Sequence, residues 1–177
     1  MPLTIDLENK KAFVSGCARG IGAGIARALA QAGCDVAGCG MAAADHENVR
    51  NFIREIERHG RKALYVQGDL SQPETPAELM QAVQAEWRSL DVLISNAGRN
   101  VFKGAELCSE DDWDECMNLD LASHWRLAKA AFPLLQASAQ SDPGSIVIIG
   151  SNHANNTIPG CFPYNVAKAG LLGLVQS

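Results

Sequence analysis

The chain of 177 residues lacks the features of several protein classes. No stretch is apolar over the length that a membrane-spanning helix needs, so we expect no contact with the membrane interior. The N-terminus has neither a basic flank nor an uninterrupted apolar run, so we expect no signal peptide. The net charge is -5 and no basic patch is present, which argues against nucleic acid or an anionic membrane as the main partner. We therefore predict a cytoplasmic globular protein.

Metal-binding and disulfide patterns are also missing from the sequence. The six cysteines include no C-x-x-C pair, and the four histidines have no metal-ligand spacing. We therefore interpret the cysteines as reduced, mostly buried apolar residues, and we predict no metal site. With 47% hydrophobic residues, no internal repeat and no low-complexity linker, residues 1–177 are expected to form one domain around a single core.

Short apolar runs alternate with helix-length amphipathic stretches along the chain. The predicted strands are 11–15, 35–39, 62–66, 91–95 and 145–149, and the predicted helices are 21–32, 46–58, 76–88 and 109–137. Gly33 stands where a positive φ should end the first helix, and Ser109 should cap the last one. Pro133 should end or kink that helix, and residues 142–144 should form a turn. The alternation predicts a doubly wound, Rossmann-type α/β fold with a parallel sheet covered on both faces.

A glycine-rich turn follows the first expected strand. It reads SGCARGIG, with glycine at positions 16, 20 and 22. Such glycines let the chain turn tightly and approach a pyrophosphate, while the next helix presents free N–H groups and its positive dipole end to the phosphates. Ile21, Ile25 and Leu29 then recur at the four-residue spacing of one apolar helix face. The alternative is a turn of the same kind that binds no ligand.

Together with later motifs, this turn resembles the short-chain dehydrogenase/reductase family. Gly16-x-x-x-Gly20-x-Gly22 resembles its cofactor motif, and Tyr164-x-x-x-Lys168 resembles its Tyr-x-x-x-Lys. Further family motifs stand between these two in the expected order, namely an acidic residue, Asn-Ala-Gly, a helix asparagine and a serine: Asp69, Asn96-Ala97-Gly98, Asn118 and Ser151. The resemblance extends over residues 11–170.

The resemblance implies an oxidoreductase that transfers a hydride between a nicotinamide cofactor and a small-molecule carbonyl or secondary alcohol. It implies a catalytic set of Asn118, Ser151, Tyr164 and Lys168, with Tyr164 as general acid/base. It also implies that the cofactor is held by Gly16, Arg19, Gly20, Ile21, Gly22, Asp69, Leu70, Asn96, Ala97, Gly98, Tyr164 and Lys168.

The residue types suit this chemistry. Tyr164 and Lys168 are four residues apart and share a helix face, so the ammonium is expected to lower the tyrosine pKa from about 10. The Ser151 hydroxyl is expected to hydrogen-bond the substrate oxygen. In the family, the matching lysine also holds the nicotinamide ribose, and the asparagine matching Asn118 anchors a water in the proton path. His153 lies two residues beyond Ser151 and is expected near the substrate cleft, where it could act as an acid or a hydrogen-bond donor. The alternative is a merely solvated loop histidine, so His153 is left out of the catalytic set.

The end of the second strand sets cofactor preference in this family. An acidic residue there binds the ribose 2′-hydroxyl of NAD, and a basic one accepts the 2′-phosphate of NADP. Gly40, Met41 and Ala42 supply neither charge, and Arg19 is placed as in many NADP-using relatives. We therefore favour NADP(H) over NAD, the alternative being that Arg19 is a solvated loop residue.

Members of the family continue beyond the point where this chain ends, so we expect a C-terminally truncated sheet with an exposed edge. Apolar residues of the last helix are expected to be poorly covered: Leu171, Leu172, Leu174 and Val175. Since family members usually associate through the helix 109–137 and the helix bearing Tyr164, a homodimer or homotetramer is expected.

Two alternative functions remain open beside the oxidoreductase. The first is a non-catalytic dinucleotide-binding or regulatory module. The full catalytic set argues against it, and the expected C-terminal truncation argues for it. The second is epimerisation or dehydration of a sugar nucleotide, which ranks last because relatives of that type usually differ in glycine spacing and chain length. The substrate cannot be named from these residues.

Overall fold

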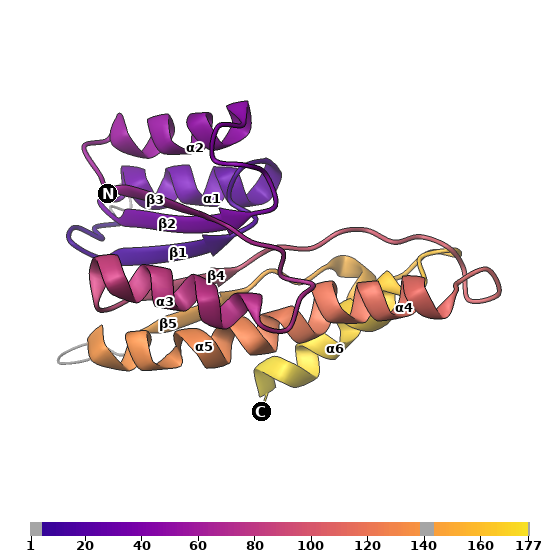
Figure 1. Cartoon of the computed structure of the whole chain (residues 1–177). Helices are drawn as coiled ribbons and strands as arrows, with labels where there is room; N and C mark the ends of the chain where they lie inside the picture. The colour runs from indigo at the N-terminus through magenta and orange to yellow at the C-terminus, as the bar shows by residue number, and fades with distance from the viewer. Residues whose placement is uncertain (1–4, 139–143, 177) are drawn as a thin grey trace, which may run out of the picture.

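In the part of the chain that the computed structural model describes, residues 5–138 and 144–176, five parallel strands form one sheet (Figure 1). The strands are β1 Lys11–Ser15, β2 Asp35–Gly40, β3 Ala63–Gln67, β4 Val92–Ser95 and β5 Ser145–Ile148. Their order is β3-β2-β1-β4-β5, and Phe13 in β1 pairs with Ala37 of β2 and Leu93 of β4. The predicted doubly wound parallel sheet is confirmed. The predicted turn at 142–144 lies, except for Gly144, outside the described residues.

Helices cover both faces of this sheet (Figure 1). Helices α1 Gly20–Gln31 and α2 Glu47–Glu57 lie on one face, and α3 Thr75–Trp87 and α5 Ser123–Ser138 lie on the other. Helix α4 Glu110–Met117, a π-helical turn Asn118–Ala122 and α5 follow one another directly, and α6 Tyr164–Gln176 packs against the π-helical turn and α4. Among the described residues, no helix has the length and apolarity to cross a membrane.

Helix α1 packs on the sheet through small side chains rather than through the expected apolar stripe. Its buried residues are Gly22, Ala26 and Ala30. The prediction of one apolar face is wrong for Ile21, which is 65% exposed, while Ile25 and Leu29 are partly buried. A Cβ on Gly22 would lie 2.2 Å from the carbonyl oxygen of Gly16, so the helix approaches the preceding turn too closely for a larger side chain. Gly33 has the predicted positive φ, 103°.

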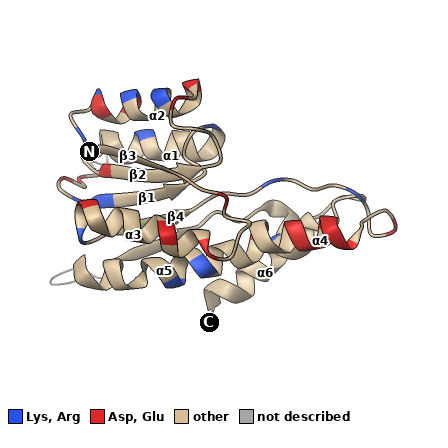
Figure 2. Cartoon of the chain, viewed as in Figure 1, with Lys and Arg blue, Asp and Glu red and all other residues tan. Residues whose placement is uncertain are grey.

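The long helical stretch begins and ends within one residue of the predicted bounds, 109–137, although a π-helical turn interrupts it. Ser109 Oγ accepts from the backbone N of Asp112 at 3.1 Å, and Asp112 Oδ2 accepts from the backbone N of Ser109 at 3.2 Å. Acidic residues gather on α4 (Figure 2), and those in its first turn are stabilised by the helix dipole. Helix α5 runs past Pro133 to Ser138, so of the two predicted effects of this proline, an end or a kink, the first is wrong. Burial of Leu134 and Leu135 in the following turn offsets the lost backbone hydrogen bond.

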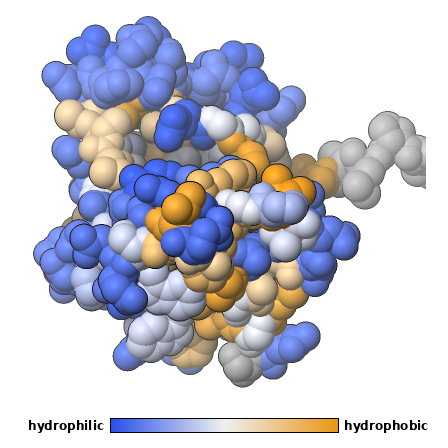
Figure 3. Space-filling view, turned by 90° about the vertical axis from the view of Figure 1, so that its right-hand side faces the viewer, coloured by the Kyte–Doolittle hydropathy of each residue, from blue (hydrophilic) through white to orange (hydrophobic). Residues whose placement is uncertain are grey.

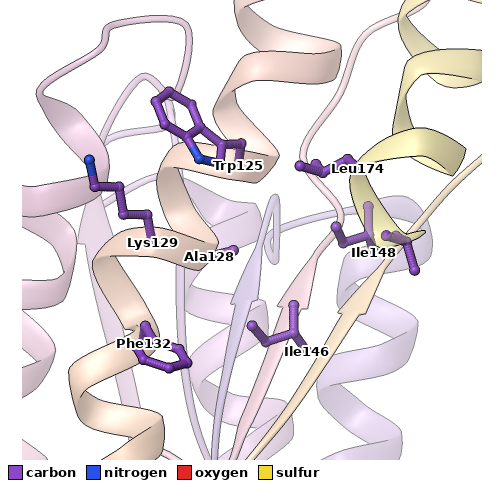
Figure 4. Close-up of a pocket in the computed structure, with 8 residues that line it drawn as sticks. Trp125, Ala128, Lys129, Phe132, Ile146, Ile148 and Leu174 are labelled. Atoms are coloured by element: carbon purple, nitrogen blue, oxygen red, sulfur yellow. The ribbon is translucent and has the colours of Figure 1, made fainter. Parts of the chain in front are cut away.

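The edge strand β5 is less covered than its neighbours. Ile146 and Val147 are 41% and 44% exposed, whereas Leu93 of the adjacent strand is fully buried. A groove of about 440 Å³ lies between α5, β5 and the end of α6 (Figure 4). Its lining is mostly apolar: Trp125, Ala128, Lys129, Phe132, Ile146, Ile148, Leu174 and Val175. The prediction of poor cover is wrong for Leu171, which is 2% exposed because the first half of α6 packs on the π-helical turn.

Candidate active site

A cleft of about 640 Å³ opens at the carboxyl ends of the strands. Strand order reverses between β1 and β4, and open α/β sheets bind ligands at such a switch point. Figure 3 views the molecule from this side and shows hydrophobic and hydrophilic residues intermixed on the surface. Most of the residues predicted to hold a cofactor line the cleft: Gly16, Arg19, Gly20, Ile21, Asp69, Leu70, Asn96, Ala97, Gly98, Tyr164 and Lys168.

The glycine-rich turn is shaped to receive a phosphate. Gly16 and Gly20 have φ values of 67° and 57°, in the left-handed region that favours glycine. A Cβ on Gly20 would meet no atom within 4 Å, so the space beside it is open. The N-cap residue of α1, Arg19, makes no side-chain capping bond, which leaves the first amides of the helix available to an anion. Gly22 lies beneath this surface, against Gly16, and supports the turn instead of lining the cleft.

Neutral hydrogen bonds hold the floor of the cleft. Asn96 Nδ2 donates to the carbonyl oxygen of Ser15 at 2.9 Å. The backbone N–H groups of Asn96 and Ala97 both donate to Ser15 Oγ, at 2.8 and 2.9 Å. Ser15 is fully buried at the end of β1, so these bonds fix the end of β4 against it. The sequence did not identify Ser15, because a serine at a strand end carries no signal of its own.

The far end of the cleft lies beside β2 and β3. Asp69 Oδ1 accepts from the backbone N and the hydroxyl of Ser71 at 2.9 and 2.8 Å, which fixes the turn that carries Leu70. The hydroxyl of Tyr65 lies 2.9 Å from the carbonyl oxygen of Gly40 and 2.7 Å from that of Ala42, and holds the segment after β2. The described residues that line the β2 end carry no carboxylate: Cys39, Gly40, Met41, Ala42, His46 and Asn48.

Tyr164 and Lys168 lie side by side at the start of α6, as their spacing predicted. They are 8% and 3% exposed, and Lys168 Nζ is 5.5 Å from the centroid of the Tyr164 ring. Burial raises the pKa of Tyr164, a hydrogen bond with Ser151 lowers it, and the charge of Asp120 raises it, with a net increase above the usual value. The prediction that this pKa is lowered is therefore wrong, because burial and a nearby carboxylate both disfavour the phenolate.

The carboxylate beside Lys168 belongs to Asp120 in the π-helical turn. Lys168 Nζ lies 3.3 Å from Asp120 Oδ1, with side chains 4% and 0% exposed. The backbone N of Arg99 donates to both carboxylate oxygens, at 3.2 and 3.3 Å. Burial raises the pKa of Asp120, whereas Lys168 and the Arg99 donor oppose that rise. A Cβ on Gly98 would lie 2.6 Å from Asp120 Oδ1, so the Asn-Ala-Gly segment needs a glycine here.

The structure does not bring Asn118 to this group of residues. Its Oδ1 accepts from Arg126 Nη1 at 3.2 Å, and it does not line the cleft, whereas Leu119 and Asp120 do. Side chains two positions apart in a helical turn point in different directions, so Asn118 and Asp120 cannot face the same site. Asp120 was missed by the sequence analysis. The available signal was a carboxylate between Leu119 and Leu121. Leucines are usually buried, and a carboxylate that is buried among them usually has a partner of opposite charge.

An aromatic cluster borders Tyr164 on its exposed side. The centroids of the His153 and Phe102 rings lie 6.1 and 5.8 Å from that of Tyr164, and 5.7 Å from each other. The backbone N of His153 donates to Ser151 Oγ at 3.2 Å, which orients that hydroxyl. The Nδ1 atom of His153 is buried without a hydrogen-bond partner among the described residues. The ring of His153 therefore packs beside Tyr164, which rules out the alternative that this histidine is merely solvated.

Comparison with known proteins bears on the family and on the fold. Residues 10–177 match the family model described as short chain dehydrogenase. The chain belongs to the short-chain dehydrogenase family. This short-chain dehydrogenase is 32% identical over 173 residues to 2-dehydro-3-deoxy-D-gluconate 5-dehydrogenase of Escherichia coli (strain K12). The match covers 96% of this chain and 64% of the relative, so the chain spans less than two thirds of that protein's length. The predicted family is confirmed.

Solved structures of similar proteins share the fold of this short-chain dehydrogenase. A blue fluorescent protein from a metagenomic library, in complex with NADPH, has a TM-score of 0.85 and 32% identity, covering 96% of this chain and 67% of that one. Carveol dehydrogenase from Mycobacterium avium, in complex with NAD, has a TM-score of 0.87 and 25% identity, covering 97% and 65%. The two complexes carry different nicotinamide dinucleotides.

Proposed function

We propose that this short-chain dehydrogenase binds a nicotinamide dinucleotide and exchanges a hydride between it and a carbonyl or secondary-alcohol substrate, with Tyr164 as general acid/base. The observation that carries the proposal is the pairing of Tyr164 with Lys168 in the cleft that the glycine-rich turn also lines. A purely structural Tyr-Lys pair would not need to lie in a cleft with an open phosphate turn. Membership of a dehydrogenase family supports the reaction class.

The cleft offers a place for each part of the dinucleotide. The turn from Gly16 to Gly22 and the first amides of α1 would hold the pyrophosphate. Asp69 and Leu70 would lie beside the adenine, and Asn96 to Gly98 would form the floor under the nicotinamide, with Lys168 at its ribose. When bound, the nicotinamide accepts or supplies the hydride.

NADP(H) is the preferred cofactor in this proposal. The described lining at the end of β2 carries no carboxylate that would repel a 2′-phosphate, and Arg19 lines the same cleft. The similar protein at 32% identity was solved with NADPH, whereas the NAD complex is that of a protein at 25% identity.

Tyr164 and its neighbours would carry out the proton transfer to the substrate oxygen. In carbonyl reduction the Tyr164 phenol donates its proton to the substrate oxygen as the carbonyl carbon receives the hydride. Ser151 would donate to the same oxygen while charge develops there, and its interaction with Tyr164 lowers the pKa of that phenol. The backbone N of His153 occupies one acceptor site of the Ser151 hydroxyl, which limits its orientations.

Replacement of Tyr164 by phenylalanine tests the proposal. Because the phenol supplies the proton, Tyr164→Phe should lower turnover by about 10²- to 10⁴-fold, the range typical of a general acid/base. NADPH binding should stay within about threefold of wild type, since the ring itself is retained. Steady-state kinetics with a panel of ketones and secondary alcohols measures the effect. Undiminished turnover in Tyr164→Phe would refute the acid/base role.

A further inference from the structure

An aromatic wall lies beside Tyr164, outside the cleft that the dinucleotide is proposed to fill. It consists of Phe102, from the segment after β4, and His153, from the 3-10 helical turn Asn152–Ala154, and neither of the two lines that cleft. We propose that Phe102 and His153 are specificity-determining residues, and that the substrate carbonyl or alcohol is carried by a ring system that includes a flat aromatic ring. This inference rests on the proposed hydride transfer and names a substrate class for it.

The aromatic wall lies next to the groups that would transfer the proton. The centroids of the Phe102 and His153 rings are 5.8 and 6.1 Å from that of Tyr164. The backbone N of His153 donates to Ser151 Oγ at 3.2 Å, and Ser151 in turn interacts with Tyr164. A substrate whose carbonyl oxygen reaches Tyr164 and Ser151 therefore places the groups around its carbonyl carbon beside the two rings.

The fold holds Phe102 in place although much of this residue is exposed. Phe102 forms an antiparallel bridge with Pro163, the residue before Tyr164. The backbone N of Lys103 donates to the carbonyl oxygen of Phe162 at 3.0 Å. Phe102 nevertheless remains 46% exposed, compared with 8% for Tyr164. A single exposed apolar side chain is common on protein surfaces, but this one is fixed beside the proposed general acid/base. Its exposed surface is therefore available to an apolar part of the substrate.

The arrangement of the rings favours an aromatic partner. Phe102 and His153 meet edge to face, with centroids 5.7 Å apart and ring planes at 73°. Both also meet Tyr164 edge to face, at 63° and 73° respectively. None of the three rings is stacked on another, and the exposed part of the Phe102 ring can therefore accept a further ring. A flat ring of the substrate would form an offset-stacked or edge-to-face contact there, which adds to the gain from apolar burial.

Polar recognition is weaker at the aromatic wall. The Nδ1 atom of His153 is buried without a hydrogen-bond partner among the described residues, so this atom is shielded from a substrate hydroxyl. Two cations flank Phe102 in the chain, and both are paired. Arg99 forms an ion pair with Glu115, and Lys103 Nζ lies 3.5 Å from Asp112 Oδ2. These pairs reduce the attraction of both cations for an anion, so a ring ketone fits this wall better than a polyhydroxylated or acidic substrate.

The aromatic wall would act on substrate binding and not on the bonds that form. In reduction, the carbonyl carbon gains the hydride of the reduced nicotinamide, and the carbonyl oxygen gains the proton of Tyr164. Phe102 and His153 take no part in either transfer. Loss of the Phe102 ring should therefore raise KM and leave kcat nearly unchanged.

Reduction of three ketones with NADPH tests the substrate class. 2-Tetralone carries its carbonyl on a ring fused to benzene, 2-decalone has the same two-ring skeleton without the aromatic ring, and dihydroxyacetone is a small polar ketone. We expect kcat/KM for 2-tetralone to exceed that for 2-decalone by about fivefold and that for dihydroxyacetone by about 100-fold. Equal values for the two ring ketones, or a preference for dihydroxyacetone, would overturn the inference.

Replacement of Phe102 by leucine tests its ring. Phe102→Leu keeps an apolar side chain without the aromatic ring, so KM for 2-tetralone should rise about fivefold while kcat stays within about twofold and KM for dihydroxyacetone is unchanged. Phe132→Leu makes the same change at a phenylalanine of α5 that is 53% exposed, and it should alter none of these values. An unchanged KM for 2-tetralone in Phe102→Leu would overturn the role of Phe102.

Two replacements of His153 separate its ring from its nitrogen atoms. His153→Phe keeps a ring and should retain the KM for 2-tetralone, whereas His153→Ala removes the ring and should raise that KM about fivefold. Circular dichroism confirms that both variants are folded. An equal rise in both variants would show that a nitrogen atom of His153 recognises the substrate, and it would overturn the aromatic role of this residue.

Binding without turnover distinguishes the failure of this inference from the failure of the proposed function. Oxidised NADP and a ketone cannot exchange a hydride, so equilibrium dialysis of the wild-type chain with excess oxidised NADP and either ring ketone measures affinity alone. About fivefold tighter binding of 2-tetralone without turnover of any ketone would support recognition of an aromatic ring and defeat the proposed hydride transfer. Equal or undetectable binding of the two ring ketones would overturn the inference, even if the chain reduces other ketones.

Discussion

The two ends of the cleft are held together by different kinds of interaction. At the nucleotide end, the turn around Gly16 is determined by its backbone conformation, and neutral hydrogen bonds join Asn96 to Ser15. At the catalytic end, Asp120 and Lys168 bring a buried ion pair beside Tyr164. Neutral contacts do not change with pH, whereas buried ionisable groups do. The turn around Gly16 and the bonds from Asn96 to Ser15 should therefore keep their shape over a wide pH range, while the ion pair beside Tyr164 responds to pH.

The largest effect on the nucleotide end is expected from Gly22→Ala. The added Cβ would lie 2.2 Å from the Gly16 carbonyl oxygen, so the turn or α1 must shift. We expect a loss of about 3 kcal/mol in the free energy of unfolding, at the upper end for overpacking, together with weaker NADPH binding. Urea unfolding measures the first quantity and fluorescence titration the second. Gly24→Ala on the same helix, where a Cβ would meet no atom within 4 Å, is the matched control.

The next largest effect should come from acid at the catalytic end. His124 is fully buried, with Nδ1 2.7 Å from Ser95 Oγ, and burial lowers its pKa from 6.5 to about 3. The unfolded chain therefore binds one proton more than the folded chain between these values, and stability falls as pH falls below 6.5. The expected loss is about 2 kcal/mol between pH 6.5 and pH 5, at ~1.4 kcal/mol per pH unit.

Urea unfolding at both pH values measures this loss, with His124→Asn as the comparison. The amide oxygen can replace Nδ1 as the partner of Ser95 but does not titrate. His124→Asn should therefore show a flatter dependence on pH than wild type. An equally steep dependence in the variant would show that another group titrates, and it would contradict the assignment of this pH dependence to His124.

A smaller effect is expected from Ser15→Ala at the nucleotide end. The variant leaves the backbone N–H groups of Asn96 and Ala97 without their shared acceptor, which should cost about 1 to 2 kcal/mol in the free energy of unfolding. Because these bonds are neutral, the cost should be the same at pH 7 and pH 5. Urea midpoints at the two pH values provide the test, and a cost that changes with pH would contradict the neutral character of this end.

The sequence was sufficient where a local pattern determines the structure. Each predicted strand is present, with its ends displaced by one residue at most, because apolar runs between helical stretches have few other ways to pack. The positive φ at Gly33 and the cap at Ser109 also follow from the chemistry of single residues. The spacing of Tyr164 and Lys168 put both on one face of α6 for the same reason.

The sequence was insufficient where three-dimensional packing determines which side chains meet and how it shifts their pKa values. Asn118 was chosen because it matches the helix asparagine of the family. Its side chain contacts Arg126, whereas Asp120 of the π-helical turn lies beside Lys168. The pKa of Tyr164 depends on burial and on that carboxylate, and neither is visible in the Tyr-x-x-x-Lys spacing. The position of His153 near Ser151 was visible in the sequence, but its ring contacts became evident only with the fold.

Titration of Gly22→Ala and Tyr164→Phe with NADPH, followed by cofactor fluorescence beside wild type, tests most directly whether the two ends have separate roles. If the glycine-rich turn holds the dinucleotide and Tyr164 serves the proton transfer, Gly22→Ala should lose at least about tenfold in affinity, a change of about 1.4 kcal/mol. Tyr164→Phe should then bind NADPH nearly as wild type does. Full affinity in Gly22→Ala together with lost affinity in Tyr164→Phe would contradict this division of roles.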